Sequence, residues 1–183
     1  TVKGDVNGDG EITTADRTMI GNPTPDVTYG FTLGLGYKNW ELAVDMMGQG
    51  GNQIYRTWDN YNWSQFNFME QRMDRWHGEG TSNTQPLLNT KHTINNLNSE
   101  YYIEDGSFFL IRNVSVAHNF DKSLISNIGM QALKLYVNIQ NLKTWKHNTG
   151  YTPELGGSAI AFGVDDGSYP MPAIYTFGFN LTF

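Results

Sequence analysis

The sequence predicts an all-β protein of antiparallel strands. Five segments alternate apolar side chains with glycine or polar side chains, which is the two-residue period of strands whose two faces differ. Of the 183 residues, 16% are charged, 14% are aromatic and 20 are glycine, a composition typical of neither a coiled coil nor a disordered acidic tail. The strands are expected at residues 28–37, 40–47, 108–118, 131–141 and 173–183.

The first two strands are predicted to form a tight hairpin. The first places apolar side chains at every second residue from Tyr29 to Tyr37, and the second does so from Trp40 onward. Only Lys38 and Asn39 lie between them, and a two-residue connection is typical of a β-hairpin.

The later strands show the same alternation. The third alternates valine with polar or small residues up to His118, and the fourth alternates Leu, Val and Ile with Lys, Tyr, Asn and Gln from Leu133. A helical turn capped by Asp121 is expected between them. The fifth alternates large apolar residues with Thr, Gly and Asn from Tyr175 to Phe183.

Three long segments rich in Gly, Asn and aromatic residues are expected to be loops, at residues 1–27, 48–107 and 142–172. Connections of this length are usually functional. A short helix around residues 64–76 is expected to interrupt the second loop. Short and long connections alternate along the chain, so the long loops would all lie at one end of the sheet.

Two architectures satisfy this pattern. In a transmembrane β-barrel the apolar face meets lipid, and strands of about nine to eleven residues are long enough to cross. In a soluble sandwich the apolar face is a core. Aromatic residues at the strand ends favour the barrel, because aromatic girdles mark membrane interfaces. Five strands cannot close such a barrel, and the first residue is Thr1 rather than Met, so we expect a C-terminal fragment of a longer polypeptide.

The composition argues against several classes of function. A net charge of −6, with 12 Lys and Arg and no basic run, argues against nucleic-acid binding. The absence of cysteine removes disulfides, thiolate zinc sites and cysteine nucleophiles. The four histidines have no metal-ligand spacing, and Ser158 lacks the following glycine of a nucleophile elbow. We therefore expect no enzymatic activity.

The sharpest local motif lies in the first loop. Asp5, Asn7, Asp9 and Asp16 stand at positions 1, 3, 5 and 12 of an EF-hand-like loop, with a glycine at position 6. The backbone carbonyl of Glu11 would complete a structural Ca²⁺ site. An aspartate replaces the usual Glu at position 12, and the alternative is a loop of Asx turns without metal.

Several short blocks occur in a characteristic order along the chain. They are Gly4-Asp5-Val6-Asn7-Gly8-Asp9-Gly10, Tyr102-Ile103-Glu104-Asp105-Gly106, Leu135-Tyr136-Val137 followed by Gln140-Asn141-Leu142, and Tyr175-Thr176-Phe177-Gly178. In this order, and with the aromatic last residue, they resemble the C-terminal part of SusC/RagA-type TonB-linked outer-membrane transporters. The region from Trp58 to Asn98 does not contribute to the resemblance.

The resemblance implies the last five strands of a plugged barrel of about 22 strands, surrounded by lipid in the outer membrane of a Gram-negative cell. It implies import of oligosaccharides or peptides, with a SusD-like surface lipoprotein as the lid and TonB as the energy source. The plug and the TonB-contacting segment would be N-terminal and absent from this chain. The alternative function is a soluble, secreted, calcium-stabilised β-sandwich module that binds glycans.

Aromatic residues in and beside the long loops are candidates for contact with the cargo or the lid. These candidates are Trp58, Tyr61, Trp63, Trp145 and Tyr151. The alternative is that they form small cores within the loops, because large aromatic side chains bury much surface.

Overall fold

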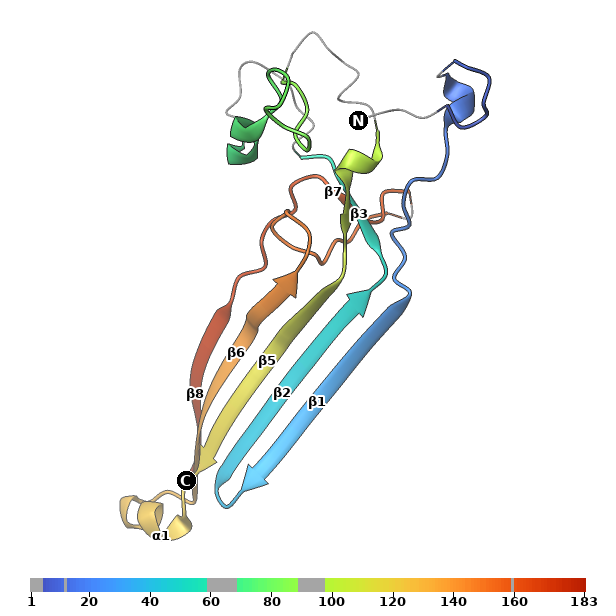
Figure 1. The fold of residues 1–183 in the computed structure, drawn as a ribbon. Helices are drawn as coiled ribbons and strands as arrows, with labels where there is room; N and C mark the ends of the chain where they lie inside the picture. The colour runs from blue at the N-terminus through green and yellow to red at the C-terminus, as the bar shows by residue number, and fades with distance from the viewer. Residues whose placement is uncertain (1–4, 12, 59–68, 89–97, 159) are drawn as a thin grey trace.

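A computed structural model describes residues 5–11, 13–58, 69–88, 98–158 and 160–183, whose regular structure is mainly antiparallel β-sheet. The largest element is a five-stranded sheet in the order β1-β2-β5-β6-β8 (Figure 1). Its strands are β1 (Val27–Tyr37), β2 (Trp40–Gly50), β5 (Phe108–Asn119), β6 (Ala132–Lys146) and β8 (Ile174–Thr182). The predicted antiparallel all-β class is confirmed. The described residues form an open sheet rather than a closed barrel.

Two strands are longer than the sequence pattern predicts. β2 continues to Gly50 and β6 continues to Lys146. Both extensions pair with β5, where Phe108 is the partner of Gln49 on one side and of Lys146 on the other. The neighbouring strand therefore sets these ends, because pairing and packing decide strand formation more than local propensity does.

The register places the apolar residues of all five strands on one face. One row across the sheet is Leu33, Val44, Val114, Ile139 and Tyr175, each paired with the next. Because side chains alternate between faces along a strand, every second row shares this face. The opposite face carries glycine and polar residues, as the two-faced pattern predicts.

A β-bulge interrupts the middle of the sheet. The register of β5 against β2 shifts between Asp45 and Met46, where Arg112 is the extra residue. Against β6 the register shifts at the same place, and there the extra residue lies on β6, where residues 141 and 142 face Arg112. Across from it, Asn141 has φ of 52°, a left-handed conformation that asparagine tolerates better than most residues. Bulges re-aim side chains, and here a guanidinium N–H of Arg112 donates to Oδ1 of Asn141 at 3.3 Å.

Two short connections close one end of the sheet, called here the turn end (Figure 1). Lys38 and Asn39 join β1 to β2, and α1 (Lys122–Ile125) with the 3₁₀ turn η5 (Ser126–Ile128) joins β5 to β6. Asp121 is the N-cap residue of this helix, as predicted, but its side chain makes no capping hydrogen bond. Its carboxylate instead accepts from the Asn39 side-chain amide at 2.8 Å, so Asp121 links the two turns.

A second, smaller sheet lies at the opposite end, called here the loop end, in the order β4-β3-β7. Its strands are β3 (Gln53–Arg56), β4 (Ile103–Asp105) and β7 (Val164–Asp165), with β3 and β7 parallel. They fall inside the segments predicted as the loops 48–107 and 142–172. Strands this short cannot display a two-residue period, which explains why the sequence pattern did not reveal them.

Among the described residues, the helical elements of the long loops are short 3₁₀ helices. They are η1 (Thr14–Asp16), η2 (Glu70–Asp74) and η4 (Glu100–Tyr102). The helix expected around residues 64–76 corresponds to η2 alone, and residues 64–68 lie outside the described part of the chain. Within that described part, no helix is long and apolar enough to span a membrane.

The buried core lies mainly toward the loop end. Ile54, Tyr102, Phe108 and Leu110 are almost completely buried there. The long sheet contributes few buried side chains, because no second layer of described residues covers its apolar face. This arrangement separates a single-layer sheet from a packed cluster of loops and short strands.

Candidate functional site

The apolar face of the long sheet is open to the surroundings. Phe177 is 76% exposed, Phe179 is 64% exposed and Phe31 is 60% exposed. A soluble sandwich would bury these side chains against a second sheet. Soluble proteins rarely expose a continuous apolar surface that spans five strands, so this face is a candidate contact with lipid or with another protein surface.

Aromatic rings gather at both ends of the apolar face. At the loop end, the ring of Phe109 stacks on Tyr29 at 6.5 Å and on Trp145 at 5.6 Å between centroids. At the turn end, the ring of His118 lies 4.4 Å from Trp40 and 4.8 Å from Phe120. Between them the face is mostly aliphatic, apart from the aromatic residues of β8. Two aromatic rows separated by an apolar band are typical of a membrane-facing surface.

The polar face carries hydrogen-bonded polar groups between glycines. Glu41 accepts from the ammonium of Lys134 at 2.5 Å and from the amide of Asn119 at 2.7 Å. Closer to the middle of the sheet, Asp45 accepts from the hydroxyl of Thr32 at 2.9 Å. These groups satisfy one another in place, so this face suits water or a polar protein surface.

The loop end is held by a buried ion pair between the two short strands β3 and β4. The guanidinium of Arg56 donates to Oε1 of Glu104 at 2.7 Å, and both side chains are nearly buried. Glu104 also accepts from the N–H of Thr149 at 2.8 Å and from its hydroxyl at 2.6 Å. One carboxylate therefore links β3, β4 and the loop after β6.

Aromatic rings surround the same guanidinium. The Arg56 guanidinium carbon lies 5.6 Å from the ring centroid of Trp58, 5.4 Å from Tyr101 and 5.8 Å from Tyr102. At these distances each ring attracts the cation through its quadrupole. Trp58, which the sequence offers as a cargo contact, lies beside this cation at the loop end.

Asp165 on β7 organises the second long loop. Its Oδ1 accepts from the N–H groups of Gly167 at 3.0 Å and Ser168 at 3.2 Å, and its backbone oxygen accepts from the N–H of Thr57 at 2.8 Å. A Cβ at Gly150 would lie 1.8 Å from the other carboxylate oxygen. Glycine is therefore required at this close approach.

The β-bulge ties the second long loop to the polar face. Arg112 donates to the carboxylate of Glu154 and to the sulfur of Met47 on β2, in addition to Asn141. Asn141 in turn donates to the carbonyl of Pro172 at 3.1 Å. The loop from β6 to β8 is thus attached to the sheet on both sides of the bulge.

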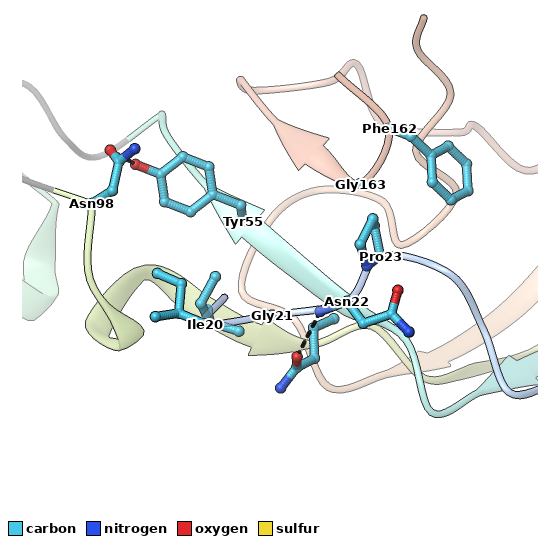
Figure 2. A pocket seen from close by; sticks show the side chains of 10 residues that line it. Ile20, Gly21, Asn22, Pro23, Tyr55, Asn98, Phe162 and Gly163 are labelled. Atoms are coloured by element: carbon cyan, nitrogen blue, oxygen red, sulfur yellow. Dashed lines mark hydrogen bonds between the residues drawn. The ribbon is translucent and has the colours of Figure 1, made fainter. Parts of the chain in front are cut away.

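Two cavities open at the loop end and share the residues Pro23, Phe162 and Gly163. The first cavity, of about 230 Å³, lies beside β3 (Figure 2). The second, of about 310 Å³, lies against the polar face of β2 and is also lined by residues 153–156. Asn22 joins the first segment of the chain to β3, since its N–H donates to Oε1 of Gln53 and its carbonyl accepts from the Gln53 N–H.

The Asp/Asn loop at residues 5–16 folds around its own carboxylates. Asp5 accepts from the N–H groups of Gly8 at 2.6 Å and Gly10 at 2.7 Å, and Asp16 accepts from Val6 and Thr13. These backbone donors hold the pKa of both carboxyls below the usual range, with the Gly10 N–H dominant at Asp5 and the Thr13 N–H dominant at Asp16.

The remaining proposed calcium ligands lie in the same loop. Asn7 donates to Asp9 at 2.8 Å, and Asp9 accepts from the N–H of Glu11 at 2.8 Å. In the described part of the chain, no three His, Asp or Glu side chains converge as a metal cluster. The loop is therefore built from Asx-type turns, and calcium binding stays a prediction.

The sequence-predicted aromatic candidates do not gather in one site. Trp145 belongs to the aromatic row on the apolar face, and Tyr151 is 72% exposed without lining either cavity. Tyr61 and Trp63 lie outside the described residues. Phe162, which lines both cavities, was not among the candidates, because a single Phe in a Gly-rich loop gives no distinguishing signal.

Comparisons with known proteins identify relatives over almost the whole chain, although no family model matches it. The TonB-dependent receptors P3 and P26 of Formosa agariphila are each 32% identical to it, over 98% of this chain and 18% and 19% of their own lengths. TonB-dependent receptor SusC of Bacteroides thetaiotaomicron is 22% identical, over 98% of this chain and 17% of its own length. The chain thus spans less than one fifth of the curated relatives that it matches.

Solved structures agree in fold. The RagAB peptide importer in its closed-closed state matches 94% of this chain and 19% of the compared chain, with a TM-score of 0.75 and 23% identity. The open-open state of the same importer matches 87% of this chain and 17% of the compared chain, with a TM-score of 0.65 and 23% identity. At this identity the likeness establishes the fold.

The chain is therefore an antiparallel sheet protein with one apolar and one polar face. By its relatives, it is homologous to the SusC/RagA family of TonB-dependent receptors over about 18% of their length. These receptors are outer-membrane transporters rather than enzymes, in agreement with the expectation that the chain has no catalytic function.

Proposed function

We propose that the chain forms part of the wall of a TonB-dependent outer-membrane importer. The observation that carries this proposal is the apolar face, which continues across five strands, lies open and ends in an aromatic row on each side. In a barrel of about 22 strands such a face meets lipid, and the opposite polar face lines the lumen. The outer edges of β1 and β8 would pair with neighbouring strands of the intact receptor.

The two ends of the sheet support one orientation. The turn end has two short connections and the loop end has the long ones (Figure 1). Outer-membrane barrels have short periplasmic turns and long extracellular loops. In this arrangement the two cavities and the buried ion pair lie on the extracellular side.

The cargo in this proposal is an oligosaccharide or a peptide, and a SusD-like surface lipoprotein covers the loop end. The sequence likeness to SusC and the fold likeness to the RagAB peptide importer support this assignment. TonB would act through an N-terminal region of the intact receptor.

The alternative, a soluble calcium-stabilised sandwich that binds glycans, fits the described residues poorly. A sandwich requires a second sheet across the apolar face. The second sheet here has strands of four, three and two residues, and it lies at the end of the long sheet. It leaves the apolar face open.

Calcium in the loop at residues 5–16 is a separate proposal. The oxygens of Asp5, Asn7, Asp9 and Asp16 and the Glu11 carbonyl are hard ligands of the kind that Ca²⁺ prefers. Calcium should then slow proteolysis of this loop in the intact receptor, and the Asp9→Ala variant should lose that protection. Equal cleavage with calcium and with chelator, in both proteins, would count against the site.

Lipid-phase labelling of single cysteines in a cysteine-free intact receptor tests the membrane assignment. This chain contains no cysteine of its own. Leu135 lies on the apolar face and Asn138 on the polar face of the same strand. A lipid-soluble thiol reagent should label Cys at position 135 and spare Cys at position 138. Labelling at neither position would refute the proposed lipid contact.

A further inference from the structure

We propose that the two cavities at the loop end form one binding site for a neutral oligosaccharide, with the ring of Phe162 as the contact between two sugar units. This inference rests on the proposed import function and names the cargo class and the residues that meet it. The two cavities share Pro23, Phe162 and Gly163, so they lie on either side of one ridge. An extended chain of sugars can occupy both cavities by crossing that ridge.

The ridge is held firmly, yet its aromatic ring is left uncovered. The carbonyl of Gly163 accepts from the N–H of Tyr55 at 2.9 Å. Gly163 has φ of 74°, and a Cβ there would lie 2.4 Å from Cβ of Pro23, so the two segments touch. Phe162 is nevertheless 44% exposed. A fixed backbone that presents an open aromatic ring is a pre-organised apolar contact surface.

The first cavity offers neutral hydrogen-bond donors. The side-chain oxygens of Asn22, Gln53 and Asn98 each accept a bond within the protein, from Thr24 N–H, Asn22 N–H and the Tyr55 hydroxyl. The described residues provide no acceptor for the three side-chain NH₂ groups, which are thus able to donate to a ligand. Figure 2 shows Asn22 and Asn98 at opposite ends of this cavity, with Tyr55 on β3 between them.

The second cavity is similar in chemistry. Gln49 and Asn52 contribute amides beside apolar walls that include Ile54 and Leu155. Glu154 is the one charged residue that lines either cavity, and Arg112 already neutralises it. Ligand pockets of this size combine mostly apolar walls with a few polar groups. Amides, a hydroxyl and an open ring without free charge match a polyhydroxy ligand better than a charged one.

The test uses the intact receptor in detergent and calorimetric titration with three probes. These are a pool of neutral oligosaccharides from partial hydrolysis of starch, xylan and laminarin, a pool of oligogalacturonates, and a tryptic digest of casein. The wild type should bind the neutral pool. Phe162→Ala should weaken that binding by about tenfold, which corresponds to about 1.4 kcal/mol, and Phe162→Trp should retain it.

Tyr169→Ala provides the matched control. Tyr169 is an aromatic residue of the same loop, is 86% exposed and lines neither cavity, so its truncation should leave binding unchanged. Equal protease resistance of the wild type and all variants checks folding.

Three results would overturn the inference. They are absence of binding to the neutral pool, preference of the wild type for oligogalacturonates or peptides, and an equal loss of affinity in Phe162→Ala and Tyr169→Ala. Lipid labelling at position 135 reports separately on the proposed function. If Cys at position 135 is labelled but the receptor does not bind neutral sugars, this binding site is rejected, whereas the proposal that the chain forms part of the importer wall remains.

Discussion

The long sheet and the loop end differ in which side chains they bury. The sheet holds its apolar side chains outward and buries few of them, whereas the loop end buries charged and polar groups such as Arg56, Glu104 and Asp165. The loop end therefore carries its own core, in which buried apolar side chains such as Ile54 and Tyr102 accompany hydrogen bonds and the Arg56–Glu104 ion pair. The sheet instead depends on what surrounds it, because its apolar face has no cover within the described residues.

The largest effect is expected when the buried ion pair at the loop end is broken. Glu104→Ala removes the carboxylate that Arg56 and Thr149 share. Removing one member of a buried ion pair costs about 3–5 kcal/mol. Hydrogen exchange in the intact receptor should show faster exchange at the β3 amides, while the amides of β1 remain protected.

Glu79→Ala, an exposed carboxylate of the same long loop, is the control for that experiment. Its exchange pattern should match the wild type. Unchanged β3 exchange in Glu104→Ala would show that the ion pair does not hold the loop end.

The second-largest effect is expected when a charge is placed on the apolar face of the sheet. An arginine on the lipid face near the bilayer midplane costs about 2–4 kcal/mol, whereas the lumen face tolerates polarity. Ile139 lies in the central row of the apolar face, next to Asn138 on the polar face. Ile139→Arg should therefore lower the amount of receptor in the outer membrane much more than Asn138→Arg does. Equal amounts of both variants would argue that the two faces have the same surroundings.

A smaller effect is expected at the ion pair on the polar face. Lys134 and Glu41 are 2.5 Å apart, and both are substantially exposed. Exposed ion pairs contribute about 0.2–1 kcal/mol, so Glu41→Gln should change thermal unfolding of the intact receptor only slightly. A loss as large as that of Glu104→Ala would mean that this face is covered by another part of the receptor.

The smallest effect concerns acid and the loop at residues 5–16. Backbone N–H donors lower the folded pKa of Asp5 and Asp16 below the unfolded value of about 3.9. Their contribution to loop order is therefore complete well above pH 4 and is lost as the pH falls through the lowered folded pKa values. Proteolysis of this loop by pepsin, measured relative to an unstructured peptide at the same pH, should accelerate only at low pH. Asp16→Asn should weaken this pH dependence, and the part that remains should come from Asp5.

The alternation of side chains predicts the long strands and their faces well. The rows through Leu33 and through Leu135 share one face, because a period of two requires it once the strands pair in register. The blocks of sequence around Asp5, Tyr102 and Tyr175 also indicate the receptor family. The alternation of side chains and the short blocks are both local features of the sequence, so they can be recognised without knowledge of the fold.

The candidate site had no comparable signal. Glu104 and Thr149 are 45 residues apart in the sequence, and nothing around either residue indicates that they meet. Phe162 stands in a Gly-rich stretch, and its place between two cavities depends on the close approach of its neighbour Gly163 to Pro23, far away along the chain. Residues joined only by tertiary contacts give no periodic pattern in the sequence.

The sequence by itself determined that five two-faced strands form an antiparallel sheet and that the chain resembles the SusC/RagA receptors. A side chain's face follows from its position along the strand, which is a local property. Tertiary structure alone decided the bulge at Arg112, the small sheet that pairs β3 with β4 and β7, and the cavities beside Phe162. These features depend on which distant segments supply hydrogen-bond partners and contact surfaces, and short strands and loops acquire their conformation only from those partners.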